Sequence, residues 1–342
     1  MNNSSDETEA VDHVVAGALM ILFGLAGIVI NTYVIYAVNK NKNFGLSFGA
    51  MCISQLTANL GNSLVFGGFV GPITMIDPSF HLSYIGSRCG QLLILFWNAS
   101  LFSHLLTTIN RLITLYYPFR YENILSAQLT FGLILLVWII SLCQVVPYFY
   151  PDCGVIFDEK TFTFGFQLTE CGLFTGTYMD FLVSIIAVAV IFTIDFFSYL
   201  KIRSIQKSAY QPVPNKDIRF FFQVLTQAVT TTTELFLYFW ISLFLRQHKW
   251  AYFASKTLAW ITVQFVDGLV FIIFNPDLRL CRKKHLRQPI ILEYPRKNLE
   301  ASEGDIEMKP TTRNEESSSP SIARTSVESI QSIDPDDITV HT

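Results

Sequence analysis

Residues 109–121 read Ile-Asn-Arg-Leu-Ile-Thr-Leu-Tyr-Tyr-Pro-Phe-Arg-Tyr, and this stretch decides the fold. It ends a long apolar run that begins at Cys89 and has no Asp, Glu, Lys or Arg before Arg111. About 20 apolar residues are enough for a helix to cross the hydrocarbon of a bilayer. Because Pro118 cannot continue a helix, we predict that a membrane-spanning helix ends here and a loop begins.

The composition places the chain among membrane proteins. Of its 342 residues, 51% are apolar and 15% are charged, whereas a soluble domain carries about 25% charged residues. The mean hydropathy is +0.39. The first apolar run, Val14 to Val38, is too long for the core of a removable signal peptide and follows no basic segment. We therefore expect it to remain as a membrane span.

Seven apolar runs follow one another along the chain. They cover residues 14–38, 46–72, 89–117, 126–149, 177–200, 218–243 and 254–275. Each is long enough to cross a bilayer, and lipid cannot satisfy an open backbone, so each should be a helix. The predicted fold class is an all-α membrane protein with a seven-transmembrane helix bundle. The sixth run is the weakest, because Glu234 and a group of threonines lie in its middle.

The distribution of Lys and Arg predicts the orientation. With the N-terminus outside and the C-terminus in the cytoplasm, the outer segments hold only Arg88, Lys160, Arg246, Lys249 and Lys256. The larger share lies in the inner segments, as the positive-inside rule requires: Lys40, Lys42, Arg111, Arg120, Lys201, Arg203, Lys207, Lys216, Arg219, Arg279, Arg282, Lys283, Lys284 and Arg287.

Three domains follow from this topology. Residues 1–13 are an acidic extracellular N-terminus with glycosylation sequons at Asn2 and Asn3. Residues 14–288 form the seven-transmembrane domain, which ends in a short basic and apolar segment along the inner membrane surface. Residues 289–342 are polar, acidic and rich in Ser and Thr, which predicts a disordered cytoplasmic tail.

The longest outer loop, residues 150–176, carries two cysteines, Cys153 and Cys171. Residues between them alternate around a turn, which predicts a β-hairpin over the mouth of the bundle. Together with Cys89, these cysteines lie on the oxidising side, where three cysteines allow one disulfide and one cysteine left over.

Four acidic residues lie inside the predicted spans, where ionisable groups are costly and should face the bundle interior. We expect Asp195 to pair with a nearby basic residue and Asp267 to join an internal hydrogen-bond network. Asp180 and Glu234 lie in the outer halves of their helices, so they are the candidate ligand-binding residues. Trp97, two turns inside Cys89, is a candidate for the same pocket.

The order of several motifs resembles the rhodopsin-like G-protein-coupled receptors, and more specifically the nematode serpentine chemoreceptors of class x (Srx). The resemblance covers residues 14–284 and rests on "INR…YYPFRY", on "RFFFQ" at 219–223, on "DG" at 267–268 with "FNPDLR" at 274–279, and on the acidic outer loop with two cysteines. Two positions depart from the wider pattern: Asn110 stands where Asp or Glu is usual, and Arg279 stands where Tyr is usual.

The resemblance implies roles for individual residues. The G-protein coupling and activation switch would comprise Asn110, Arg111, Asn275, Pro276 and Arg279. It favours a disulfide from Cys89 to the second outer loop, where Cys171 is the preferred partner. A Cys153–Cys171 disulfide is the alternative. Cys281, in the segment after the last span, is a palmitoylation candidate.

The resemblance also implies a function. We expect a chemosensory receptor in the plasma membrane of a sensory-neuron cilium that binds a small molecule and activates a heterotrimeric G protein. The Ser/Thr-rich tail would recruit an arrestin-like protein. The alternatives are a receptor for an internal peptide or amine and a small membrane transporter.

The sequence carries none of the usual enzyme motifs. It has no GxSxG, HExxH or P-loop pattern and no paired Cys/His spacing for a metal. Its basic residues flank the spans and form no separate patch for nucleic acid. We therefore expect neither an enzyme nor a cofactor, metal or nucleic-acid partner.

Overall fold

The computed structural model describes residues 3–41, 44–207 and 215–279, with only the backbone described at 3–6 and 215–216. The chain divides into two units, Met1–Lys284 and His285–Thr342, and every described residue lies in the first. Several predictions lie outside the described part: the disordered tail, the palmitoylation of Cys281, and the glycosylation of Asn2 and of the Asn3 side chain.

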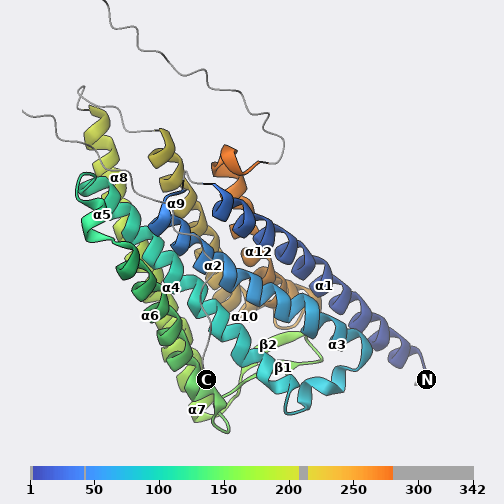
Figure 1. The fold of residues 1–342 in the computed structure, drawn as a ribbon. Coiled ribbons are helices and arrows are strands. Elements are labelled where there is room, and N and C mark those ends of the chain that lie inside the picture. Colours follow the sequence, from blue (N-terminus) through green and yellow to red (C-terminus); the bar gives the residue numbers. More distant parts are fainter. Residues whose placement is uncertain (1–2, 42–43, 208–214, 280–342) are drawn as a thin grey trace, which may run out of the picture. The chain divides into compact units, whose positions relative to one another are not determined.

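Seven long helical stretches run side by side in this unit (Figure 1). The first three are α1 (Asn3–Lys40); α2 (Leu46–Val65) with η2 (Phe66–Val70) and α3 (Gly71–Ile76); and η4 (Gly86–Arg88) with α4 (Cys89–Tyr116). The fourth is α6 (Ala127–Val145) with η5 (Val146–Phe149), and the fifth is α7 (Glu170–Phe174) with η6 (Thr175–Leu182) and α8 (Val183–Lys207). The sixth is α9 (Asn215–Phe236) with η7 (Leu237–Ile241) and α10 (Ser242–Leu245). The seventh is α11 (Lys249–Phe253) with η8 (Ala254–Leu258), α12 (Ala259–Phe274) and η9 (Pro276–Leu278).

The connections between these helices contain short elements: η3 (Pro78–Leu82), α5 (Tyr121–Ile124), β1 (Val155–Asp158) and β2 (Thr163–Phe166). The antiparallel strands pair Val155 with Phe166 and Asp158 with Thr163, so the predicted hairpin is confirmed. It lies against the start of α4, and α5 lies at the opposite end of the bundle (Figure 1). We call these the hairpin end and the Arg111 end.

The seven helical stretches confirm the seven predicted apolar runs. The least apolar stretch, however, is the second and not the sixth. Among the described helices, six are long and apolar enough to cross a membrane, and these include the sixth, Asp217–Leu245. The second stretch falls short because its polar side chains, such as Gln55, Asn59 and Asn62, point inward and are fully buried. This stretch packs against α1, α4, α6 and α12, which shield those side chains from lipid.

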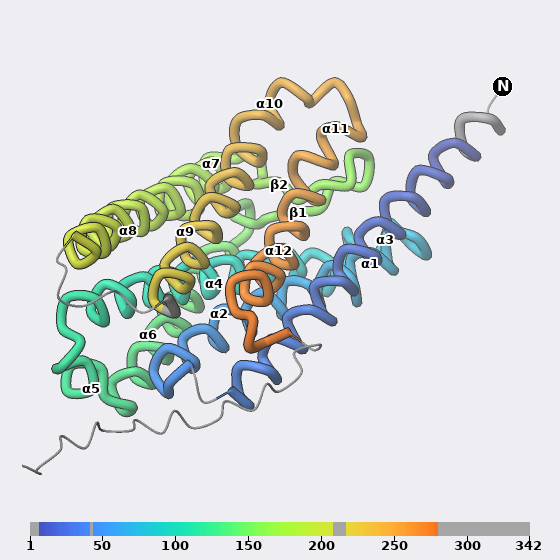
Figure 2. The backbone as a smooth tube through the Cα atoms, turned by 90° about the horizontal axis from the view of Figure 1, so that it is seen from above, coloured from blue at the N-terminus to red at the C-terminus, as the bar shows by residue number. Residues whose placement is uncertain are grey.

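Two glycines set the closest approach between the first two helices. A methyl group on Gly24 of α1 would lie 2.5 Å from the Cα of Gly67 in η2. Only residues without side chains allow two helix backbones to come this close. Figure 2 shows α1 beside α2 and α12, with α4 lying inside the bundle.

The disulfide differs from the preferred prediction. Cys153 bonds to Cys171, with their Cα atoms 4.8 Å apart, while Cys89 is a buried free cysteine. The pairing of Cys89 with Cys171 was therefore wrong, and the alternative is the one observed. The physical reason is the hairpin, whose strands bring the residues before β1 and after β2 together, as the hydrogen bond from the Gln167 amide to the Gly154 carbonyl at 3.2 Å shows.

Candidate functional site

Arg111 lies near the end of α4 between two phenyl rings. Its guanidinium carbon is 3.3 Å from the ring centre of Phe48 on α2 and 4.1 Å from that of Phe220 on α9. Its Nη1 atom is 3.9 Å from Oδ1 of Asp217, in the first turn of α9. A cation over aromatic faces is held electrostatically by the rings. Arg111 thus connects the second, third and sixth helices, while its buried Nε and Nη2 atoms have no hydrogen-bond partner.

Asn110 makes different contacts from Arg111. Its Nδ2 atom donates to the Tyr121 hydroxyl at 2.9 Å, and this hydrogen bond links α5 to the end of α4. The acid that usually precedes the Arg in rhodopsin-like receptors is absent, and Asp217 of α9 supplies the nearest carboxylate instead.

Asn275 and Pro276 end the seventh helix beside α9. The Asn275 Nδ2 atom donates to Oε1 of Gln223 at 2.6 Å and to the Phe271 carbonyl at 2.8 Å. The "RFFFQ" motif therefore contacts two residues of the predicted switch, because Phe220 contacts Arg111 and Gln223 contacts Asn275. Arg279 is separate: it is exposed and donates to the carbonyls of Ile272 and Ile273.

A polar network occupies the centre of the bundle. The Asp267 Oδ2 atom on α12 accepts from Gln55 and from Asn59 on α2, both at 3.2 Å, and the Ser100 hydroxyl of α4 donates to Asn59 at 2.6 Å. The predicted hydrogen-bond network around Asp267 is confirmed. Asp195 behaves differently, since among the described residues it forms no ion pair and its buried Oδ2 atom has no partner.

Asp180 and Glu234, the candidate ligand-binding residues, line one cavity toward the hairpin end. They come from η6 and α9, each is 5% exposed, and both line one small cavity with Trp97. This cavity offers about 10 Å³ to the centre of a water molecule, which is about the room that one water requires. Oδ1 of Asp180 and Oε2 of Glu234 have no hydrogen-bond partner.

Aromatic rings enclose this cavity. Trp97 and Trp260 pack edge to face with ring centres 6.2 Å apart, and Trp260 packs in the same way on Tyr238 at 5.9 Å. The Trp97 Nε1 atom donates to the Ser184 hydroxyl at 3.3 Å, whereas the buried Nε1 of Trp260 has no partner. The result is a small aromatic site with two acids, each of which has one oxygen without a hydrogen-bond partner.

The β-hairpin covers this site. Its turn residue Phe162 is fully buried, and its carbonyl accepts from the Thr257 hydroxyl at 2.7 Å. The Phe164 carbonyl accepts from the Tyr238 hydroxyl at 3.0 Å, so the strand is tied directly to a residue of the cavity wall. Lys249 places its ammonium 4.3 Å from the ring centre of Phe162 and pairs with Asp12 of α1 at 2.8 Å.

Four helices change to π-helical geometry around the same end of the bundle. These stretches are η2, η6, η7 and η8, in the second, fifth, sixth and seventh helices. Each contains or adjoins a residue of the site or its cover, such as Asp180 in η6 and Tyr238 in η7. π-Helical turns are rare and occur frequently at functional sites.

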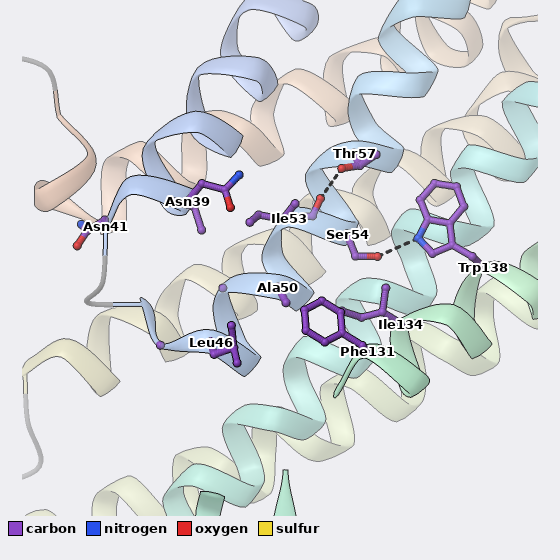
Figure 3. Close-up of a pocket in the computed structure, with 13 residues that line it drawn as sticks. Asn39, Asn41, Leu46, Ala50, Ile53, Ser54, Thr57, Phe131, Ile134 and Trp138 are labelled. Atoms are coloured by element: carbon purple, nitrogen blue, oxygen red, sulfur yellow. Dashed lines mark hydrogen bonds between the residues drawn. The ribbon is translucent and has the colours of Figure 1, made fainter. Parts of the chain in front are cut away.

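A larger hollow lies toward the Arg111 end, outside the helix bundle core. It has a volume of about 690 Å³ and lies between the end of α1, α2 and α6 (Figure 3). Trp138 closes one side and donates from Nε1 to the Ser54 hydroxyl at 3.1 Å. None of the predicted site residues lines this hollow.

The comparisons with known proteins identify one family. Residues 21–275 match the family described as "Serpentine type 7TM GPCR chemoreceptor Srx". The chain belongs to the Srx family of serpentine chemoreceptors. It is a multi-pass membrane protein and a receptor of the G-protein-coupled type, not an enzyme.

Two Caenorhabditis elegans proteins are similar to this Srx receptor. Serpentine receptor class X 45 is 25% identical over 297 residues, covering 80% of this chain and 81% of the relative. Serpentine receptor class X-43 is 24% identical over 289 residues, covering 81% and 86%. Among solved structures, squid rhodopsin superposes with a TM-score of 0.60 at 12% identity, covering 79% of this chain and 84% of that one. The rhodopsin likeness shows the shared fold.

Sequence reasoning missed two aromatic residues of the site, Tyr238 and Trp260. Helical spacing could have found both. Tyr238 follows Glu234 by four residues, and Trp260 precedes Asp267 by seven, so each lies on the helix face that an intramembrane acid already marks.

Proposed function

We propose that this Srx receptor is a chemosensory receptor that binds a small molecule near Trp97, Asp180 and Glu234 and activates a heterotrimeric G protein at the Arg111 end. The single observation that carries the proposal is the contact of Arg111 with Asp217, because it joins the third and sixth helices at the face where a G protein would bind.

The proposed orientation puts the N-terminus and the hairpin end outside and the Arg111 end and the C-terminus in the cytoplasm. The excess of Lys and Arg in the segments at the Arg111 end supports it. The Cys153–Cys171 disulfide supports it too, since disulfides persist on the oxidising side of a membrane. Residues 14–288 would then be the receptor domain, with residues 1–13 outside.

In this proposal the inner switch consists of Arg111 and Asn275 acting on α9. Arg111 holds the start of α9 through Asp217 and Phe220, and Asn275 holds it one turn further on through Gln223. Movement of α9 away from α4 breaks the Asp217 contact and exposes the unpartnered donors of Arg111. A ligand favours that state only if it binds that state more tightly. Asn110, Pro276 and Arg279 shape the neighbouring helix ends.

The outer ligand site and the inner switch share one helix. Glu234 of the ligand site and Asp217 of the switch both lie on α9, and the Asp267 network lies between them in the bundle. A shift of α9 at one end is therefore transmitted to the other end by a single rigid element.

Further parts of the proposal rest on the sequence alone. They are glycosylation of Asn2 or Asn3, palmitoylation of Cys281, recruitment of an arrestin-like protein by the Ser/Thr-rich tail, and placement in a sensory-neuron cilium.

A recruitment assay tests the proposed function. Cells that express the receptor and a panel of labelled G proteins are exposed to volatile and water-soluble small molecules. We expect recruitment that depends on one chemical class and saturates with concentration. Flux of a solute across the membrane without any G-protein dependence would contradict the proposal and favour a transporter.

A further inference from the structure

We propose that the site at the hairpin end takes a small membrane-soluble organic amine, and that this ligand enters from the bilayer between the sixth and seventh helices, with Glu234 at the inner end of the route. This inference deepens the proposed function, on which it rests, by naming the ligand class and its path.

The two buried acids of the site favour a cationic partner. Asp180 and Glu234 are both nine-tenths buried or more, and each has a carboxylate oxygen without a hydrogen-bond partner. Among the described residues, no ion pair joins either carboxylate to a Lys, Arg or His. A buried carboxylate without a partner is destabilising, so an ammonium group placed between the two would be bound strongly.

Lys256 lies against Tyr238 of the cavity wall, and its ammonium has partners other than the two acids. The Lys256 ammonium lies 4.4 Å from the ring centre of Tyr238 and donates to the Tyr252 hydroxyl at 3.4 Å. Its described contacts are with these two phenol rings. A single lysine could in any case neutralise only one of two carboxylates.

The walls of the cavity suit an organic cation. Trp97, Tyr238 and Trp260 present rings around the two acids. Aromatic faces attract ammonium groups, and the attraction is stronger where water is excluded. A hydrated metal ion would instead need several oxygen ligands, and no group of three or more potential metal ligands occurs among the described residues.

Direct entry from the hairpin end is closed. Phe162 and Phe164 of the hairpin are buried, and their carbonyls accept hydrogen bonds from Thr257 and Tyr238. The Cys153–Cys171 disulfide fixes the base of the same hairpin. A ligand arriving from the aqueous side would have to break all of these contacts.

A cleft on the side of the bundle reaches the same acid. It has a volume of about 310 Å³, lies between α9 and the seventh helix, and has Glu234 and Val263 as its buried floor. Thr233 and Ala254 are exposed at its mouth. Glu234 lines both this cleft and the small cavity with Asp180, so the two are separated by one side chain.

The cleft and the cavity together indicate the chemical class of the ligand. Apolar and small residues such as Leu237, Ala254 and Leu258 form the cleft, which suits an alkyl chain, and the acids at its floor suit an ammonium group. The π-helical stretches η7 and η8 run along its two edges. Interrupted hydrogen-bond patterns there give the helices a place to separate when a ligand enters.

Direct binding tests the proposal without signalling. The receptor is placed in nanodiscs of phosphatidylcholine, and binding of tritiated octylamine is measured above that of empty nanodiscs. We expect saturable binding of octylamine, at least tenfold weaker binding by Glu234→Gln, and no saturable binding of tritiated octanol. Equal binding of octylamine and octanol would overturn the ammonium assignment.

Two alanines test the route. Both Ala254, at the mouth of the cleft, and Ala189, on the outward face of α8, are exposed. Ala254→Phe should slow octylamine association about tenfold or abolish binding, while Ala189→Phe should leave it unchanged. If both variants bind at the wild-type rate, entry through the cleft is wrong. Should Glu234→Gln fail to fold, Asp180→Asn serves in its place, and unchanged octylamine binding by a folded acid variant overturns the site.

A lipid amine is the competing occupant. Phosphatidylethanolamine added to the nanodiscs should leave octylamine binding unchanged, and competition by this lipid would replace the free amine with a lipid headgroup. These tests distinguish this inference from the proposed function. G-protein recruitment without amine binding would reject only the amine site. Amine binding without G-protein recruitment would reject only the signalling role.

Discussion

Arg111 of α4 and Asp217 of α9 lie 3.9 Å apart, and this pair spans the third and sixth helices at one end of the bundle. The guanidinium is buried between Phe48 and Phe220, whereas the Asp217 side chain is 26% exposed. The pair is therefore a partly solvated contact on a buried cation. Partly solvated ion pairs contribute little to stability, so in the proposed mechanism this contact can break on activation.

Asp217→Asn should raise the basal activity. Partly exposed ion pairs contribute about 0.2–1 kcal/mol, so removing the charge should shift the population toward the active arrangement by up to about fivefold. Basal G-protein recruitment at matched surface expression measures this. Glu122→Gln removes an exposed acid of α5 at the same end of the bundle and is the matched control. An equal rise in both variants would mean that net charge, and not the Arg111 contact, is responsible.

Two neighbouring glycines should respond in opposite ways to the same change. Gly67 approaches the backbone of Gly24, and a methyl group there would lie 2.9 Å from the Gly24 Cα, whereas Gly68 has open space around it. Gly67→Ala should cost about 1–3 kcal/mol through overpacking. Gly68→Ala should be neutral or stabilising, because Ala favours a helix over Gly. The melting temperatures of the purified variants test this prediction. Equal melting temperatures for Gly67→Ala and Gly68→Ala would argue against the close packing of α1 on η2.

Removing the hairpin disulfide should destabilise the receptor. Cys153 and Cys171 close a loop with a sequence separation of 18 residues, and a crosslink of this size contributes about 3 kcal/mol. Cys153→Ser and Cys171→Ser should lower the melting temperature by similar amounts, and the double variant should be no worse than either one. Cys89→Ala should not lower the melting temperature further under reducing conditions than under oxidising ones, because Cys89 is a free cysteine. A Cys89-containing disulfide in peptide mapping would contradict the observed pairing.

His81 should make the hairpin end sensitive to acid. It lies in η3, outside the membrane spans, where its Nε2 atom is 3.0 Å from the Thr74 hydroxyl and its ring packs on Phe157. The pKa of His81 is lowered from 6.5 to about 4, chiefly by burial and in part by His13, while Asp77 acts in the opposite direction.

The sign of the effect follows from this lowered pKa. Between pH 6.5 and about 4 the unfolded chain binds a proton at His81 that the folded receptor does not, so stability is present above pH 6.5 and is lost as the pH falls. Melting temperatures from pH 7 to pH 4.5 should drop in the wild type and drop less in His81→Asn. Parallel curves for the two proteins would rule out this role of His81.

Periodicity and composition were sufficient to predict the bundle. The seven runs and the hairpin were predicted because apolar length and alternation depend on local sequence alone. The second helix shows the limit of this prediction. Its Asn59 and Asn62 lower the apolar character of the span, yet both are fully buried in the interior. Hydropathy cannot tell a polar residue that faces lipid from one that faces other helices.

The candidate site was predicted in part for a similar reason. Asp180 and Glu234 stand out because acids are rare in spans, and the structure brings them into one cavity. The disulfide was mispredicted because pairing depends on which strands meet, and the cover formed by Phe162 and Phe164 depends on tertiary contacts that no local pattern encodes. The Asp217 partner of Arg111 was missed because it lies outside the sixth apolar run.

G-protein recruitment by Arg111→Ala is the most direct test of the proposed switch at Arg111. Wild type and variant are expressed in the same cells at matched surface levels, and recruitment of a panel of heterotrimeric G proteins is measured with and without an activating ligand. We expect normal surface expression of the variant and loss of recruitment, because Arg111 connects the third and sixth helices at the proposed coupling face. Normal ligand-dependent recruitment by Arg111→Ala would contradict the proposed switch.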